Sequence, residues 1–568
     1  MNLNKNLHWF VYIIFLISCA RQSSPTGGPK DTIPPVLQKA IPPDEAINFK
    51  GKDIELIFSE DVILNTPKEQ LIINPTIGKD YKITSRKNSV SITFAQELED
   101  STTYTFNFRE SIQDITEKNP VRNLQVAFST GDYIDSLSIE GTIYDLLKGK
   151  EIKEATVALH IENDTFNILE HPAVYFTKTD DKGKFKLNHL KPDNYFIYSF
   201  EDKNRNLVVD SRTESYGFIS ENLYLLENLK NISIGLIRLD ARPLKMTSAR
   251  PYNTYFNIRT AKNLRTFELT AADSSDLSYT FGEDQANIRL YKTTEQDSLK
   301  IHLLAIDSID NRIDTTLYVK FLTREVTPEK FDLSIQSSSI IAEKGQMDAT
   351  LVFTKPFKEI NFDSIFFQID SLRKINFTQE DVSWDPLLRK LTIEKKVDRN
   401  LFLTDETTPK PPANAKETAH PGGKSETKKT ILNEFYLGIL AFISIENDSS
   451  KKITQTIKPL KEEELSIINI EIKTKEEAFI VELLDNTFKV IKRFKNKTKV
   501  RFEDITPGEY QIRLIIDSNG NGRWDPGNYF METEPEKIIY YRAPDGSTTI
   551  KGVKANWEIG EGEMFITY

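Results

Sequence analysis

The sequence predicts an all-β protein built from β-sandwiches arranged one after another, and three observations support this. Residues that favour strands are abundant, with 34 Phe, 21 Tyr and many Thr, Ile and Val. Short stretches of alternating apolar and polar residues are separated by Pro, Asn and Gly, as in sheets with one buried face. One such segment occurs twice in the 568 residues, which indicates two copies of one fold.

Composition and charge limit the classes of function. With 39% hydrophobic and 28% charged residues, the chain is globular rather than disordered. The formal net charge is −10, whereas nucleic-acid binding requires a basic face that neutralises phosphates. We therefore expect no nucleic-acid partner and no electrostatic docking on anionic lipids.

The first 18 residues predict a lipoprotein signal peptide. An apolar run from Leu7 to Ile17 is too short to span a bilayer, which takes about 20 residues, but it fits a signal-peptide core. It ends at Ser18 and Cys19, the only cysteine, and this ending resembles the lipobox of bacterial lipoproteins. The resemblance implies cleavage after residue 18 and acyl chains such as palmitate on Cys19, enough lipid to anchor the protein stably to a membrane. The alternative is a plain secretory signal with a coincidental cysteine.

Residues 19–30 are rich in Ser, Pro and Gly and predict a flexible tether. Some surface lipoproteins of Bacteroidota carry an acidic export signal directly after the cysteine, but Ala20, Arg21 and Gln22 stand here. Because no Asp follows Cys19, we expect the outer rather than the inner membrane. The face of that membrane stays open, with the cell surface slightly preferred over the periplasmic side.

Residues 31–132 contain four motifs that occur together in one family. A DTIPP entry at Asp31 is followed by an FSE strand around Phe58, a TYTF strand from Thr103 and a closing FSTG that ends at Gly131. This combination resembles the bacterial Ig-like domains of surface-layer proteins and Bacteroidota lipoproteins. The resemblance implies a β-sandwich with alternating inward and outward residues.

The repeated segment lies in residues 137–240 and again in residues 462–568. Both regions resemble the small transthyretin-like sandwich that serves as a regulatory module in carboxypeptidases. Seven residues of the first copy match seven of the second at one constant offset. They are Pro192, Tyr195, Ile197, Asp202, Asn204, Asn206 and Asp210, which match Pro507, Tyr510, Ile512, Asp517, Asn519, Asn521 and Asp525.

Two further regions, 241–327 and 328–460, are rich in predicted strands and are interpreted as Ig-like sandwiches. Within the second, residues 404–430 lack any apolar periodicity. Such a segment cannot bury a core, so we expect a disordered surface loop there.

The two Asp/Asn loops are candidates for weak structural calcium sites. Asp517, Asn519, Asn521 and Asp525 occupy alternating positions that could direct oxygens toward a hard cation, and Gly522 lies at the turn. The first copy has Asp202, Asn204, Asn206 and Asp210, but Leu207 replaces the glycine. The bidentate Glu of such loops is missing at the twelfth position, where Asn528 stands. The favoured alternative is an Asx-rich turn whose side chains bond their own backbone.

No arrangement of residues predicts catalysis. The histidines have no metal-ligand spacing, no nucleophile elbow or phosphate loop occurs, and Cys19 is assigned to lipid. We therefore expect no enzyme, no catalytic residue and no cofactor apart from the calcium considered above.

A recurring Asp-Ser pair followed by an apolar residue resembles the O-glycosylation acceptor of Bacteroidota periplasmic and surface proteins. In a chain rich in Ser and Asp, such tripeptides also arise by chance. The acceptors that this resemblance implies are Ser136, Ser298, Ser308, Ser364 and Ser371.

Two classes of function fit these features. The first is a non-enzymatic outer-membrane lipoprotein that acts as a structural, assembly or accessory subunit. Resemblance to Ig-like lipoproteins implies outer-membrane β-barrel proteins as partners, in a barrel-assembly, secretion or uptake machine. The alternative is a cell-surface glycan-binding or adhesion lipoprotein, for which Trp524 is the most suggestive aromatic platform.

Overall fold

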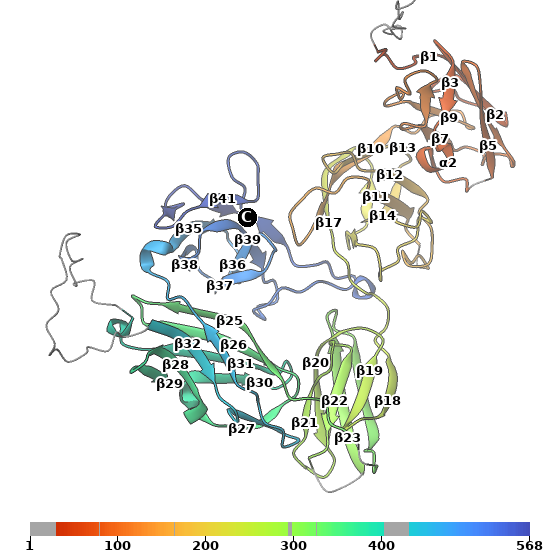
Figure 1. Ribbon diagram of the computed structural model, residues 1–568. Helices are drawn as coiled ribbons and strands as arrows, with labels where there is room; N and C mark the ends of the chain where they lie inside the picture. The colour runs from red at the N-terminus through yellow and green to blue at the C-terminus, as the bar shows by residue number, and fades with distance from the viewer. Residues whose placement is uncertain (1–29, 79, 164, 294–297, 325, 403–430) are drawn as a thin grey trace, which may run out of the picture.

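The computed structural model describes residues 30–568 except 79, 164, 294–297, 325 and 403–430. These residues form an all-β structure of successive modules with two or three sheets each, so the predicted fold class is confirmed. Figure 1 shows five modules in chain order from red to blue. The signal peptide, Cys19, the tether up to residue 29 and the insertion 404–430 lie outside the described residues. Within the described part of the chain, no helix has the length and apolar character needed to cross a bilayer.

The first module packs a four-stranded sheet, β1-β2-β6-β5, against a three-stranded sheet, β4-β7-β9, and also contains a two-stranded sheet, β3-β8. Its elements are β1 (Leu37–Ile41), β2 (Asp53–Phe58), β3 (Val62–Leu64), α2 (Pro67–Gln70), β4 (Ile72–Asn74), β5 (Tyr81–Arg86), β6 (Ser89–Phe94), β7 (Thr103–Asn107), β8 (Ile112–Asp114) and β9 (Gln125–Ser129). Ile54, Leu56 and Phe58 alternate along β2 and are buried, which gives the sheet its single apolar face.

The second and fifth modules share one topology. The second contains β10 (Leu137–Asp145), β11 (Thr156–Ile161), β12 (Tyr175–Lys178), β13 (Lys184–Leu190), β14 (Asp193–Phe200), β15 (Tyr216–Phe218), β16 (Leu223–Leu225) and β17 (Leu229–Leu236). The fifth contains η4 (Glu462–Glu464), β35 (Ser466–Lys473), β36 (Phe479–Asp485), β37 (Val490–Lys495), β38 (Lys499–Ile505), β39 (Gly508–Ile516), η5 (Tyr529–Met531), β40 (Ile538–Tyr540), β41 (Ile550–Val553), β42 (Glu558–Ile559) and β43 (Phe565–Thr567). The sheet β12-β11-β14-β15 corresponds to β37-β36-β39-β40. In the other sheet, the first strand pairs in parallel with the last strands of the module in both copies.

The third and fourth modules lie between these copies. The third contains β18 (Met246–Tyr252), β19 (Tyr255–Thr260), β20 (Leu264–Ala271), β21 (Ser278–Phe281), β22 (Asn287–Tyr291), β23 (Ser298–Asp307) and β24 (Arg312–Lys320). The fourth contains β25 (Leu333–Ile341), β26 (Gln346–Phe353), β27 (Phe357–Ile360), η1 (Phe362–Ser364), β28 (Ile365–Asp370), β29 (Lys374–Asn376), η2 (Gln379–Asp381), β30 (Val382–Asp385), β31 (Lys390–Lys396), η3 (Arg399–Leu401), β32 (Ile431–Leu437), β33 (Phe442–Ser444) and β34 (Ile453–Thr456). Each module has its own hydrophobic core between its sheets.

The fifth module folds back onto the second. In Figure 1 the C-terminal module, in blue, lies beside both the yellow second module and the green-to-cyan fourth module. Strand β36 is buried on both faces, because Val481 and Leu483 enter its own core while Ile480 and Leu484 enter a second cluster. That second cluster also contains Leu146 of the second module. Modules two to five therefore form a closed arrangement, and the first module extends from it.

Polar contacts fix the other junctions. At the junction of modules three and four, the Arg389 guanidinium donates to the Thr280 hydroxyl at 3.0 Å and to the Gly282 carbonyl at 3.1 Å. At the junction of modules four and five, the Lys344 ammonium pairs with Glu503 at 3.1 Å and with Asp504 at 2.8 Å. Because each junction combines chain continuity with such contacts, neighbouring modules are held in defined orientations.

The first and second modules are joined by a side-chain amide that makes the two hydrogen bonds a neighbouring strand would make. Asn74, which is buried at the end of the edge strand β4, donates from its amide nitrogen to the Phe176 carbonyl at 2.8 Å. Its amide oxygen accepts from the Phe176 backbone N–H at 2.8 Å. The Thr76 N–H donates to the Val174 carbonyl at 2.7 Å. Two sheet edges thereby protect each other.

We expect Asn74→Ala to loosen this junction, because the N–H and C=O of Phe176 would lose their partner. The expected cost is about 1–3 kcal/mol, seen as faster hydrogen exchange at the amides of β12. The control is Asn376→Ala, which removes an exposed amide from β29. Unchanged exchange in β12 would contradict the assigned role of Asn74.

Candidate functional site

The two Asp/Asn loops occupy the same place in the two related modules. Each begins where the longest strand of the five-stranded sheet ends: Asp202 follows β14, and Asp517 follows β39. In the first loop, both carboxylate oxygens of Asp202 accept backbone N–H groups, from Asn206 at 3.1 Å and from Leu207 at 3.3 Å. This is the hydrogen bonding of an Asx-rich turn.

The second loop repeats this pattern. Asp517 accepts the N–H groups of Asn521 at 3.0 Å and of Gly522 at 2.8 Å. The side-chain amides of Asn519 and Asn521 both donate to the Asp525 carboxylate, at 2.6 and 2.5 Å. The loop thus brings the four predicted oxygen-bearing residues together, and their hydrogen bonds are directed toward one another. Calcium binding at either loop stays a prediction.

The turn residue differs between the two loops, although its backbone conformation is the same. Gly522 has a φ of 77° and Leu207 has a φ of 61°, so both adopt the left-handed conformation. Glycine adopts this conformation without steric cost, whereas leucine is strained by it. The first loop therefore keeps the same backbone path at a conformational cost.

A buried glutamate completes each loop and was missed by the sequence analysis. Glu214 accepts the N–H groups of Lys203 and Asp210, each at 2.9 Å. Glu536 accepts the equivalent N–H groups, from Ser518 at 2.7 Å and Asp525 at 2.9 Å. Glu214 follows Asp210 by four positions and Glu536 follows Asp525 by eleven, so the constant offset of the repeat ends before it reaches them. A search for a carboxylate beyond the twelfth loop position would have identified Glu214.

Burial raises the pKa of Glu536, and the nearby Asp525 and Asp517 carboxylates raise it further, against the lowering effect of its two backbone hydrogen bonds. Three carboxyl groups therefore interact at this loop, which is an electrostatic cost in the absence of a cation.

The displacement of Glu536 comes from seven extra residues (11 − 4) within residues 526–535, which we call the hook segment. It contains η5 and reaches the second and third modules. The Tyr529 ring packs on Phe218, with centroids 5.4 Å apart, and its oxygen accepts the Ile168 N–H at 3.2 Å. The buried Asn528 amide donates to the Ile309 carbonyl of the third module at 2.8 Å. The insertion therefore turns a loop into a contact between modules.

The hook segment lies next to the apolar contact that joins the second and fifth modules. The Tyr540 hydroxyl donates to the Leu147 carbonyl across this contact. Each fully buried Leu or Ile there contributes about 1.5–3 kcal/mol relative to exposure. The buried members are Leu146, Ile237, Ile480, Leu484, Ile515, Ile538 and Tyr540.

Trp524, the suggested aromatic platform, packs against this same contact. Its indole N–H donates to the Glu536 carbonyl at 3.0 Å and its ring is half-buried. Trp384 packs on Phe353 and Phe357 in the fourth module. Trp557 is exposed near the C-terminus. Trp524 therefore holds the loop in place through this bond and its packing, and its ring is only partly exposed.

The predicted glycosylation acceptors lie in turns or at strand ends. Ser136, Ser298, Ser308 and Ser371 are exposed, and Ser364 is half-buried in η1. The aspartate before Ser371 has a structural role, since the Leu372 N–H donates to Asp370 at 2.8 Å. This bond, with further bonds from Arg373, lowers the pKa of Asp370 to about 2. An Asp-Ser pair thus also fits a turn that the carboxylate stabilises, while modification stays a prediction.

Some buried charges in the described residues are held in ion pairs, whereas others, such as Glu214, accept backbone N–H groups instead. Glu482 is fully buried and accepts from the Nε atoms of Arg493 and Arg513, both at 2.7 Å. The buried Lys355 pairs with Glu446 and Asp448. Such pairs need excellent geometry to offset their loss of hydration. No group of three or more His, Cys, Asp or Glu within the described ranges is arranged to hold a metal ion.

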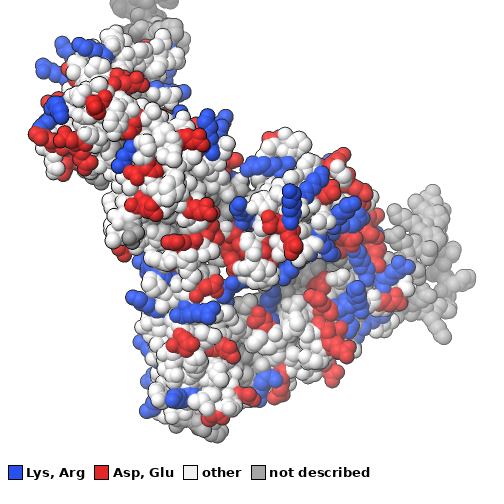
Figure 2. Space-filling model, turned by 180° about the vertical axis from the view of Figure 1, so that it is seen from behind, with Lys and Arg blue, Asp and Glu red and all other residues white. Residues whose placement is uncertain are grey.

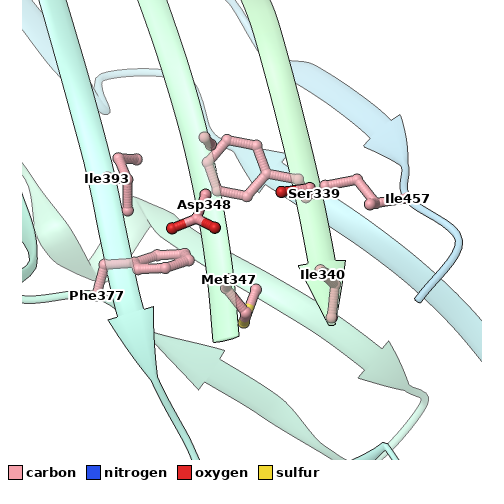
Figure 3. A pocket seen from close by; sticks show the side chains of 9 residues that line it. Ser339, Ile340, Met347, Asp348, Phe377, Ile393 and Ile457 are labelled. Carbon is pink, nitrogen blue, oxygen red and sulfur yellow. The ribbon is translucent and has the colours of Figure 1, made fainter. Parts of the chain in front are cut away.

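A small cavity lies inside the fourth module (Figure 3). Ile340, Met347, Phe377 and Ile393 surround it, with Asp348 and Ser339 at its border. Its volume is about 10 Å³, which is room for one water molecule at most. It is a packing defect rather than a ligand site.

Comparison with known proteins places the first module in a family. Residues 31–130 match the family model of the bacterial Ig-like domain. The predicted Ig-like character of this module is thereby confirmed. No curated protein matches the chain.

Solved structures resemble the chain only remotely. The Bacillus anthracis TIE protein is 10% identical, with 99% of this chain and 78% of that chain covered and a TM-score of 0.12. The N-terminal part of the bacterial S-layer protein SbsC is 12% identical over 51% of this chain and 44% of that one, with a TM-score of 0.14. BcpA, the major pilin subunit of Bacillus cereus, is 12% identical over 76% and 98%, with a TM-score of 0.12. Superpositions at these scores give no information about function, and the transthyretin-like character of modules two and five stays a prediction.

The raised pKa of Glu536 predicts a pH dependence of stability. Between the ordinary carboxyl pKa and the raised one, the folded state binds the proton more tightly than the unfolded chain does. Stability contributed by this group is therefore present at low pH and falls as the pH rises through that window. Glu536→Gln should flatten this slope in thermal unfolding scans from pH 4 to 7, a range chosen around the ordinary Glu value of about 4.3.

Calcium distinguishes the two interpretations of the loop in the same scans. A bound cation would stabilise the three carboxylates and remove the slope of the wild-type protein. A slope that calcium and EGTA leave equal would support the Asx-rich turn. An identical slope in wild type and Glu536→Gln would contradict the assignment to Glu536.

Removing the Tyr529 ring should open the closed arrangement of modules. Tyr529→Ala loses the contacts to Phe196 and Phe218 and leaves the Ile168 N–H without an acceptor. We expect the junction to weaken by about 2 kcal/mol or more, measured as faster proteolysis near the hook segment and a larger radius in small-angle scattering. The control is Tyr224→Ala, which removes an exposed ring. Equal proteolysis and equal radius in both variants would contradict the role of Tyr529 in holding the hook segment on the second module.

Proposed function

We propose that the protein is a non-enzymatic outer-membrane lipoprotein, anchored by lipid on Cys19, that serves as a structural or assembly subunit. Its partners are outer-membrane β-barrel proteins, in a barrel-assembly, secretion or uptake machine. The lipobox-like ending of the apolar N-terminal run supports the anchor. Partner class and taxon rest on resemblance to the Ig-like lipoproteins of Bacteroidota.

The observation that carries the proposal is the docking of the fifth module on the second. A chain of independently mobile modules would present no fixed surface, whereas Leu146, Ile480 and Leu484 bury one common apolar contact. A scaffold that positions a partner benefits from such fixed geometry, because less entropy is lost on binding. The first module extends from the second module, away from modules three to five (Figure 1).

The surface charge supports a protein partner. On the face seen in Figure 2, Lys and Arg side chains are interspersed with Asp and Glu over all modules in view. Interspersed charges of both signs suit specific protein contacts at a polar rim. A nucleic-acid partner would instead favour a continuous basic surface.

The anchor and the partner are tested together in the native cells. With the full-length chain, we expect label from an alkyne-palmitate analogue, sedimentation with the outer membrane, and a β-barrel protein in a mild-detergent pull-down. Cys19→Ser should abolish all three, because the acyl chains are lost. The control Ser23→Ala should behave as wild type.

Two results would contradict the proposal. An unlabelled wild-type protein would refute lipidation at Cys19. Recovery of the labelled lipoprotein without any β-barrel protein would refute the assigned partner and leave the anchor intact.

A further inference from the structure

A cavity of about 360 Å³ lies between the second module and the hook segment. This volume falls within the range of small-molecule sites, about 300–1,000 Å³. The second module contributes the end of β11, strands β14 and β15 and the turns that follow, and the fifth contributes Tyr529, Phe530 and Glu532. The cavity is therefore complete only when the two modules are docked.

Aromatic rings form the apolar part of the cavity lining. Phe196 and Phe218 come from adjacent strands, and both pack edge-to-face with Tyr529, at centroid distances of 6.3 and 5.4 Å. Phe166 and the exposed Phe530 also belong to this apolar part of the lining. Flat aromatic surfaces of this kind pack against the C–H faces of a sugar ring, which are apolar although the ring edge is polar.

Polar side chains also line the cavity, and they offer both hydrogen-bond donors and hydrogen-bond acceptors. The amide oxygens of Asn163 and Asn167 accept backbone N–H groups, from Thr165 and Leu169, each at 3.0 Å. Their amide nitrogens have no partner within the described residues and are available as donors. The Asn222 amide donates to Glu162 at 2.6 Å, which leaves the Asn222 oxygen as an acceptor.

The charge of the lining residues limits the chemical class of ligand that this cavity can bind. Glu162 and Glu532 border the cavity, and none of the described residues that line it is Lys or Arg. Phosphate, sulfate and carboxylate groups would be repelled here. A purely cationic ligand such as choline offers no acceptor to the amide donors of Asn163 and Asn167. A neutral ligand with many hydroxyl groups satisfies donors and acceptors together.

We propose that this cavity binds a neutral saccharide unit, which stacks on the aromatic rings and hydrogen-bonds to the amides and carboxylates that also line the cavity. The site is distinct from Trp524 and from the Asp/Asn loops. It goes beyond the proposed assembly role and does not depend on it, since binding is measured on the isolated protein.

The test uses the full-length lipoprotein in detergent on an array of neutral glucan, mannan, xylan and galactan oligosaccharides, followed by calorimetry with the best binder. We expect a Kd of about 1 mM or tighter. Phe530→Ala should weaken binding about tenfold, the effect of losing about 1.4 kcal/mol. The matched control is Phe565→Ala, which removes a ring of similar exposure from the same module, 52% against 55%.

Asn163→Asp provides a second variant in which the hook segment is untouched. It keeps an oxygen that can accept the Thr165 N–H, but it replaces the amide donor with a second acceptor oxygen and adds a negative charge. A ligand oxygen that accepts from the Asn163 amide therefore loses its donor, and binding should also weaken. The proposal is overturned if no neutral oligosaccharide binds at millimolar concentration, or if Phe565→Ala loses as much affinity as Phe530→Ala. Preferential binding of acidic saccharides or of choline would overturn it as well.

Discussion

The apolar contact between the second and fifth modules is the interaction on which the rest of the structure depends. Strand β36 contributes to two apolar clusters, one on each face. Alternate residues enter the core of the fifth module on one face and the contact with Leu146 on the other. Once this contact forms, the chain ends near its second module, and the third and fourth modules must bridge the distance between them. The polar junctions at Arg389 and Lys344 then fix orientations that the contact has already restricted.

The two copies of one sandwich differ in the contacts that their Asp/Asn loops make. Both keep the Asp/Asn loop and the buried glutamate that closes it, Glu214 in one and Glu536 in the other. In the second copy the hook segment separates the loop from its glutamate. Because this insertion carries Asn528 and Tyr529, a loop of local function becomes the point where three modules meet. The same insertion completes the cavity assigned to a saccharide.

The proposed roles are compatible with each other. A rigid, lipid-anchored unit positions a partner, and a saccharide site at the junction of two modules would respond to whether those modules are docked. A ligand that contacts both modules stabilises the docked state by mass action, since it binds only that state. Structural closure and ligand binding would then be thermodynamically linked.

The local sequence determined the all-β fold class of this protein and the positions of its Asp/Asn loops. Alternation along β2, with Ile54, Leu56 and Phe58 inward, is visible in the residues and gives the all-β fold. The Asp/Asn loops could be predicted from spacing, because an Asx turn needs only its own backbone. Residues from Ile480 to Leu484 are buried on both faces of β36, but nothing in the local sequence identifies what covers the second face. The docking surface, Glu536 and the cavity were decided by tertiary structure, because their partners lie hundreds of residues apart and meet only after the modules have folded.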